Sequence, residues 1–100
     1  MGFFNLFRNK TKKIHDFTNR GAVILDVRSK AEYEQGAIPG SKHIPLQQIT
    51  SEIDLIKKWN SPIIICCASG MRSATAAGIL TSNGIESMNG GGWFSLSNKL

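Results

Sequence analysis

The sequence predicts a single α/β domain of three layers, in which helices cover both faces of a mostly parallel sheet. Two apolar, β-branched runs at residues 22–27 and 62–67 are typical of buried strands, and helical patterns lie between and after them. Strands that alternate with helices favour parallel pairing, because each crossover helix covers one face of the sheet. With 100 residues, of which 41% are hydrophobic, the chain suffices for one core and has no room for a second.

The first third of the chain contains two helix patterns around the first strand. Residues 10–21 predict a short helix that points Ile14 and Phe17 inward and stops at Gly21, and the strand at residues 22–27 follows. Residues 29–36 predict a second short helix, because Ser29 followed three residues later by Glu32 is the pattern of a capping box.

The middle of the chain predicts a loop, a helix and the second buried strand. The loop at residues 37–45 holds two prolines and a brief strand near His43 and Ile44. Apolar residues then recur at helical spacing and predict one helix that ends near residues 59–60; they are Leu46, Ile49, Ile53 and Ile56. Pro62 opens a continuous apolar run, which indicates a strand buried on both faces.

The last third of the chain predicts a helix, a strand and a final helical piece. Small residues at 72–83 favour a helix lying close to the sheet, and Gly84 suits a left-handed cap. Residues 85–88 predict a short strand, residues 90–92 a turn, and Trp93 onward a terminal helix.

The basic residues are concentrated near the N-terminus. Residues 1–30 hold seven basic and two acidic residues, whereas residues 31–100 hold five of each, so the formal charge of +5 belongs to the first third. We interpret residues 1–10 as a basic and aromatic tail and residues 11–100 as the domain. A solvated face is the favoured interpretation of the basic residues, with contact to an anionic membrane or nucleic acid as the alternative.

The sequence shows no pattern of a signal peptide and no apolar run of membrane-spanning length. Its two cysteines are adjacent, so they staple no loop, and free thiols are typical of a reducing compartment. We therefore expect a cytoplasmic protein that does not insert into membranes and does not bind nucleic acid, and we expect a monomer.

The junction after the second buried strand is the candidate reactive site. Cys67 ends the strand, Gly70 supplies the freedom for a tight curl, and a helix follows. We call residues 67–73 the cysteine loop. Such a loop turns backbone N–H groups inward in front of a helix N-terminus, which favours a thiolate, a persulfide or a bound oxyanion, and Arg72 adds positive charge. Because strand residues alternate, Cys66 points to the other face and serves the core.

Three blocks of the sequence then fall in the order of a known family. They are "ILDVRSKAEYEQGAIPGSKHIP", "IIICCASGMRSATAAGIL" and "MNGGGW". From residue 11 onward the chain resembles single-domain rhodanese-like sulfurtransferases, and the fold expected from this resemblance is the rhodanese-like three-layer fold.

The resemblance implies a role for each residue of the cysteine loop. Cys67 would be the nucleophile that takes a sulfane sulfur from a small anionic donor such as thiosulfate and carries it as a persulfide. A thiol, cyanide or protein acceptor would then remove the sulfur, and no metal or organic cofactor is needed. Arg72 would orient the donor, and backbone amides would stabilise the persulfide and the leaving anion. The substrate-binding residues are thus Ala68, Ser69, Gly70, Met71, Arg72 and Ser73.

Asp26 and Arg28 lie at the end of the first strand and carry over as supporting residues. Buried charges of this kind act mainly by pairing and by fixing the neighbouring backbone, and Glu32 is a candidate partner for either arginine. One departure from the family pattern is Ala37, which stands where many members have histidine. We expect activity to survive this change because the position lies outside the cysteine loop.

Two other functions compete with sulfur transfer. Cysteine phosphatases and related arsenate reductases place five residues between cysteine and arginine, whereas four lie between Cys67 and Arg72 here. The smaller loop suits one extra sulfur atom better than a tetrahedral oxyanion. The other alternative is a non-catalytic or sulfur-carrier module that delivers a persulfide to a partner protein.

Overall fold

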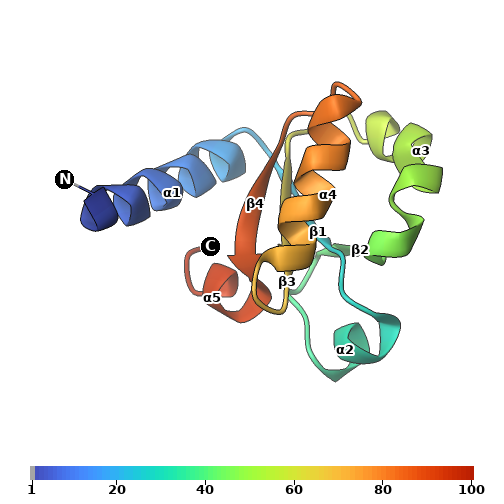
Figure 1. Cartoon of the computed structure of the whole chain (residues 1–100), viewed down its shortest axis with the longest axis horizontal. Helices are drawn as coiled ribbons and strands as arrows, with labels where there is room; N and C mark the ends of the chain where they lie inside the picture. Colours follow the sequence, from blue (N-terminus) through green and yellow to red (C-terminus); the bar gives the residue numbers. More distant parts are fainter. Residues whose placement is uncertain (1) are drawn as a thin grey trace.

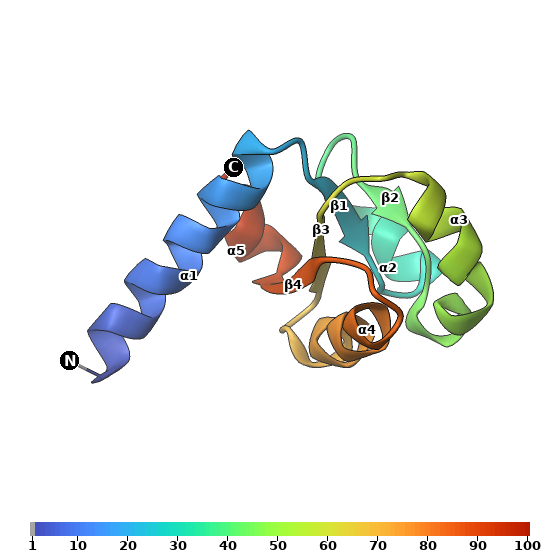
Figure 2. The ribbon, with the colours of Figure 1, turned by 90° about the horizontal axis from the view of Figure 1, so that it is seen from above.

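The computed structural model describes the backbone of residues 2–100 and the side chains of residues 9–100. A four-stranded, wholly parallel sheet in the order β2-β1-β3-β4 forms the middle of the domain. Figures 1 and 2 show the helices on both sides of it. The strands are β1 (Val23–Asp26), β2 (Lys42–His43), β3 (Ile63–Cys67) and β4 (Ser87–Gly92). The α-helices are α1 (Gly2–Asn19), α2 (Lys30–Gln35), α3 (Ile53–Lys58), α4 (Met71–Ser82) and α5 (Trp93–Ser97).

The predicted three-layer α/β architecture is confirmed. One core cluster lies between the sheet and the side of α3 and α4, and includes Ile49, Ile56, Ala76 and Leu80. The other lies between the sheet and α1 with α5, and includes Ile14, Phe17, Met88 and Leu96.

Strand β3 is buried along its whole length, as its apolar run predicts. Its side chains alternate between the two core clusters, so that Ile63, Ile65 and Cys67 enter one and Ile64 and Cys66 the other. The strand therefore anchors both layers and carries Cys67 to the carboxyl edge of the sheet, where parallel α/β folds bind ligands.

Helix α1 is longer than the sequence predicts, because it begins at Gly2 and not near residue 10. Ile14 and Phe17 are 0% and 3% exposed, so the predicted inward face is confirmed. The aromatic side chains of the basic tail, Phe3, Phe4 and Phe7, lie outside the described residues. A boundary between tail and domain at residue 10 stays a prediction.

The capping box of α2 is confirmed. The Ser29 hydroxyl accepts from the Glu32 amide at 3.3 Å, and the Glu32 carboxylate accepts from the Ser29 amide at 3.0 Å. This arrangement holds the Glu32 side chain at the start of α2, next to the end of β1.

The single helix predicted from residue 46 to residues 59–60 is wrong in its first half. Two 3₁₀ turns, η1 (Leu46–Gln48) and η2 (Thr50–Glu52), precede α3. The hydroxyl of Ser51 donates to the Gln48 carbonyl at 2.9 Å, which offers the backbone an alternative to the α-helical ladder. Ile49 and Ile56 still face the core at 0% and 1% exposure.

The turn predicted at residues 90–92 is also wrong, because these glycines belong to β4. The pairing between β3 and β4 shifts register after Ile65, and Gly91 and Gly92 then pair with Cys66 and Cys67. A Cβ at Gly92 would lie 2.7 Å from the Ala68 carbonyl oxygen, so only glycine allows the strand to run this close to the cysteine loop.

Candidate active site

Cys67 is the last residue of β3, and its side chain is 1% exposed. The chain leaves the sheet there, passes the exposed residues Ala68 and Ser69, and enters α4 at Met71. Gly70 makes this curl with φ +101°, in the left-handed region that favours glycine. The sulfur therefore lies at the bottom of a tight loop in front of a helix N-terminus.

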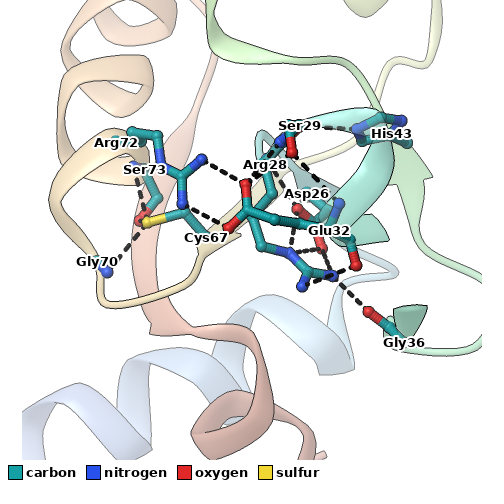
Figure 3. Close-up of polar contacts among 10 residues, drawn as sticks. All are labelled: Asp26, Arg28, Ser29, Glu32, Gly36, His43, Cys67, Gly70, Arg72 and Ser73. Carbon is teal, nitrogen blue, oxygen red and sulfur yellow. Dashed lines mark hydrogen bonds and ion pairs between the residues drawn. The ribbon is translucent and has the colours of Figure 1, made fainter. Parts of the chain in front are cut away.

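The Cys67 sulfur accepts hydrogen bonds from the cysteine loop itself (Figure 3). The backbone amide of Gly70 lies 3.0 Å from Sγ and that of Ser73 lies 3.4 Å away. The Ser73 hydroxyl, fully buried, lies 3.3 Å from the same atom. Burial raises the pKa of the Cys67 thiol, but the bonds from Ser73, Gly70 and Ser69 outweigh burial and lower this pKa to about 7.

Of the residues predicted to line the loop, only some contact the sulfur. Gly70 and Ser73 do so through hydrogen bonds, and a hydrogen bond from the Ser69 amide helps to lower the pKa of the thiol. Ala68 is exposed, and Met71 is 79% exposed at the rim. A role for Ala68 or Met71 in binding a substrate stays a prediction.

Cys66 lies in the opposite environment. It is 0% exposed and packs in the cluster of α1 and α5. Burial, followed by the negative charge of Asp26, raises the pKa of Cys66 to about 12. Its predicted orientation, away from Cys67, is confirmed.

Arg72 is paired with a carboxylate. Its guanidinium makes a two-bonded ion pair with the Glu32 carboxylate at 2.8 and 3.0 Å (Figure 3). Both side chains are 36% exposed. Hydrogen bonds from Arg72, and then from the Ser29 backbone, lower the pKa of Glu32 to about 2. Glu32, a candidate partner of either arginine from the sequence, is thus the partner of Arg72.

Asp26 and Arg28 form a buried pair that fixes the backbone beside the site. Their side chains are 0% and 4% exposed, and the Arg28 Nε lies 2.9 and 3.0 Å from the two carboxylate oxygens. The Arg28 Nη2 also donates to the Gly36 carbonyl at 2.6 Å, and its guanidinium lies over the Trp93 ring at 4.7 Å. The pair therefore ties the end of β1 to the segment after α2 and to α5.

Sequence reasoning missed Asn89 and the hydroxyl of Ser73. Asn89 accepts from the Ser73 hydroxyl at 2.7 Å and donates to the Gly70 carbonyl at 2.9 Å. A polar residue in a strand next to buried Met88 is a signal that could have pointed to this side chain.

Outside the cysteine loop, the described part of the chain has a hollow but no cluster that could bind a metal ion. Its residues contain no group of three histidine, cysteine or acidic side chains that could hold a metal ion. A hollow of about 270 Å³, lined by Lys57, Asn60, Pro62 and Glu86 among others, lies where β3 and β4 begin, at the opposite end of the strands from Cys67. No helix among the described residues is long and apolar enough to cross a membrane.

The chain is similar to known proteins over most of its length. Residues 10–98 match the family described as rhodanese-like domain. The thiosulfate sulfurtransferase GlpE of Pseudoalteromonas translucida is 40% identical over 72 residues, which cover 69% of this chain and 68% of that protein. YrkF of Bacillus subtilis, provisionally named a sulfur carrier protein, is 41% identical over 63 residues, or 63% of this chain and 34% of YrkF.

A solved structure agrees with the sequence comparison. The rhodanese-like domain protein of Staphylococcus aureus is 36% identical and superposes with a TM-score of 0.69 over 76% of this chain and 74% of that one. The family match covers the whole sheet and the cysteine loop. The chain belongs to the rhodanese-like domain family.

Proposed function

We propose that this protein is a sulfurtransferase that carries sulfur as a persulfide on Cys67. The observation that carries the proposal is the surroundings of Cys67 Sγ, which accepts from two backbone amides of a short loop at a helix N-terminus. These donors stabilise negative charge on the sulfur, and a pKa of about 7 leaves much of the thiol ionised at neutral pH. Its kinship with a protein named thiosulfate sulfurtransferase supports the same reaction.

In the first half of the reaction, the Cys67 thiolate attacks the outer sulfur of thiosulfate. A bond forms between Sγ and that sulfur, the sulfur–sulfur bond of thiosulfate breaks, and sulfite leaves with the electron pair. The product is a cysteine persulfide anion, whose terminal sulfur takes over the negative charge. The Gly70 and Ser73 amides are the donors placed to stabilise it.

In the second half, a thiophilic acceptor attacks the terminal sulfur of the persulfide. With cyanide, a carbon–sulfur bond forms, the persulfide bond breaks, and thiocyanate leaves while Cys67 returns as a thiolate. No proton or external electron is consumed. In the cell, a thiol or a protein acceptor takes the role of cyanide. We propose that this reaction takes place in the cytoplasm.

The size of the loop argues against phosphatase activity. Four residues separate Cys67 from Arg72, and the Arg72 guanidinium is already paired with Glu32. A dianionic phosphate ester needs several inward donors and a free cation, whereas a terminal sulfur needs little space. We therefore rank phosphoryl transfer well below sulfur transfer.

The test is intact-protein mass spectrometry after reduction, removal of the reductant and incubation with thiosulfate. We expect one added sulfur in the native protein and in Cys66→Ser, and none in Cys67→Ser. Cyanide should remove the adduct and release an equal amount of thiocyanate. The absence of an adduct on a protein that still reacts with iodoacetamide would contradict the proposal, and hydrolysis of a phosphate ester would then be measured.

The sulfur-carrier alternative is supported by the kinship with YrkF and uses the same persulfide. The two functions differ in the second half of the reaction. Cyanide can remove the sulfur from either one, so the number of turnovers distinguishes them: a carrier releases about one thiocyanate for each sulfur loaded onto it, whereas an enzyme with excess thiosulfate turns over many times. Repeated release of thiocyanate from one protein equivalent therefore favours the enzyme.

A further inference from the structure

Asn89 lies on β4, opposite Ile65 of β3, and contacts the cysteine loop at two points, Gly70 and Ser73, as well as Gly91 of its own strand. Its Nδ2 donates to the Gly70 carbonyl at 2.9 Å. Its Oδ1 accepts from the Gly91 amide at 2.9 Å and from the Ser73 hydroxyl at 2.7 Å. The orientation of the side-chain amide is unambiguous, because a carbonyl faces one end and a backbone N–H faces the other.

The contact with Ser73 determines where the serine proton goes. The Ser73 Oγ lies between Asn89 Oδ1 and Cys67 Sγ, at 2.7 and 3.3 Å. A hydroxyl has one proton, and Oδ1 only accepts. When Cys67 is a neutral thiol, its proton points to Oγ and the serine proton points to Asn89. When Cys67 is a thiolate or persulfide, the serine proton turns to the sulfur, and Oδ1 keeps its bond from Gly91.

The contact with Gly70 fixes the direction of a second donor. The Gly70 amide is the closest backbone donor to Sγ, at 3.0 Å, and the carbonyl of the same residue is held by Asn89 Nδ2. Gly70 is in the left-handed region, and a Cβ there would lie 3.3 Å from the Gly91 Cα. The loop is thus packed directly against β4 where Asn89 holds it.

We propose that Asn89 is a positioning residue for Cys67, which directs the Ser73 hydroxyl and clamps Gly70 so that the cysteine loop presents its donors to the sulfur. Asn89 does not touch the sulfur itself and acts through these two residues. The consequence for turnover rests on the proposed sulfur transfer, whereas the effect on the thiol is independent of it.

Asn89→Asp tests the proposal through the ionisation of Cys67. Aspartate keeps the size of the side chain, holds the serine proton more strongly, and cannot donate to the Gly70 carbonyl. The charged groups around Cys67 are the pairs Arg72–Glu32 and Asp26–Arg28, with Lys10 of α1 near Gly91. We expect the pH midpoint of alkylation by iodoacetamide to rise by at least about one unit, which slows alkylation about tenfold below pH 6.

Two comparisons separate a positioning role from a mere change of charge. Asn83→Asp introduces the same charge after the far end of α4, about 18 Å away along the helix, and should leave the midpoint unchanged. In a Ser73→Ala background, Asn89→Asp should shift the midpoint by less than half as much, because the hydroxyl that connects the two groups is gone. An unchanged midpoint in Asn89→Asp, or an equal shift in both backgrounds, would overturn the proposal.

A second variant serves if the aspartate protein does not fold. Asn89→Leu removes the clamp without adding charge, and we expect hydrogen exchange of the Gly70 amide to accelerate at least about tenfold while β1 stays protected. Unchanged exchange at Gly70 would refute the clamp. These readouts use no sulfur donor, so a native protein that gains no sulfur would refute the proposed function and leave the role of Asn89 intact.

Discussion

Cys66 and Cys67 are consecutive residues of one strand, yet their thiols differ in nearly every physical property. Cys66 packs among apolar side chains on the α1 and α5 face, and its pKa is raised to about 12. Cys67 faces α4, where loop amides and a hydroxyl reach its sulfur, and its pKa is lowered to about 7. Both are almost completely buried. Burial alone therefore does not make a thiol inert, because the hydrogen bonds available at the buried position decide the charge.

The largest expected difference between the two cysteines is in their rates of alkylation. At pH 7.5 most of Cys67 is thiolate, whereas roughly one part in thirty thousand of Cys66 is. We expect iodoacetamide to label Cys67 more than about a thousandfold faster in the folded protein, measured by mass spectrometry of the peptides. The rate should rise with pH around a midpoint near 7. In urea both cysteines should react alike, and preferential labelling of Cys66 in the folded protein would reverse the assignment.

The second difference concerns stability. Cys66→Ser places a hydroxyl among apolar side chains without a partner, which we expect to cost about 1–3 kcal/mol of unfolding free energy. Cys67→Ser places the hydroxyl where two amides already point, so the cost should be below about 1 kcal/mol. Urea unfolding measures both. The comparison fails if Cys67→Ser is the less stable variant.

Most of this contrast is predictable from the sequence, because it follows from local rules. Strand alternation places the two cysteines on opposite faces, and the glycine after a buried strand marks the curl of the loop. The capping box at Ser29 and Glu32 is also local and is found at its predicted place. The fold follows in the same way, since β3 is long, apolar and buried on both faces.

The rest depends on contacts between distant segments. From the sequence alone, Glu32 could pair with either Arg28 or Arg72. The position of α2 decides that it pairs with Arg72. The extension of β4 through Gly92 depends on how closely it approaches Ala68. Asn89 lies 19 residues from Gly70, and its role depends on the register shift between β3 and β4.

A substitution in the cysteine loop should reduce the difference in pKa between the two cysteines. Gly70→Ala adds a Cβ at φ +101°, 3.3 Å from the Gly91 Cα. The loop must therefore shift, and the amide of residue 70 must turn away from Cys67 Sγ. We expect the pKa of Cys67 to rise by about one unit, which slows alkylation at pH 6 about tenfold. Gly78→Ala is the matched control, because a Cβ there meets nothing within 4 Å. Equal midpoints in the two variants would mean that the loop geometry does not set the thiol pKa.

The smallest expected effect concerns Arg72, whose influence on thiosulfate binding can be separated from that of the backbone amides of the cysteine loop. Arg72 is paired with Glu32 at the surface, and exposed pairs of this kind are worth about 0–1 kcal/mol. Glu32→Gln frees the guanidinium, so we expect the KM for thiosulfate to fall about two- to fivefold, whereas Arg72→Ala should raise it by a similar factor. The alkylation midpoint of Cys67 should move little in Arg72→Ala, because the amides remain.

The same ion pair gives a pH dependence with a definite sign. Because the pKa of Glu32 is lowered to about 2 in the folded protein, the pair contributes stability above the ordinary carboxyl range. This contribution is lost as the pH falls from about 4.5 through 2. The difference in unfolding free energy between the native protein and Glu32→Gln should therefore shrink over that interval. If this difference in unfolding free energy stays constant with pH, Glu32 does not form the ion pair with Arg72. Thiosulfate would then meet an arginine that is already unpaired.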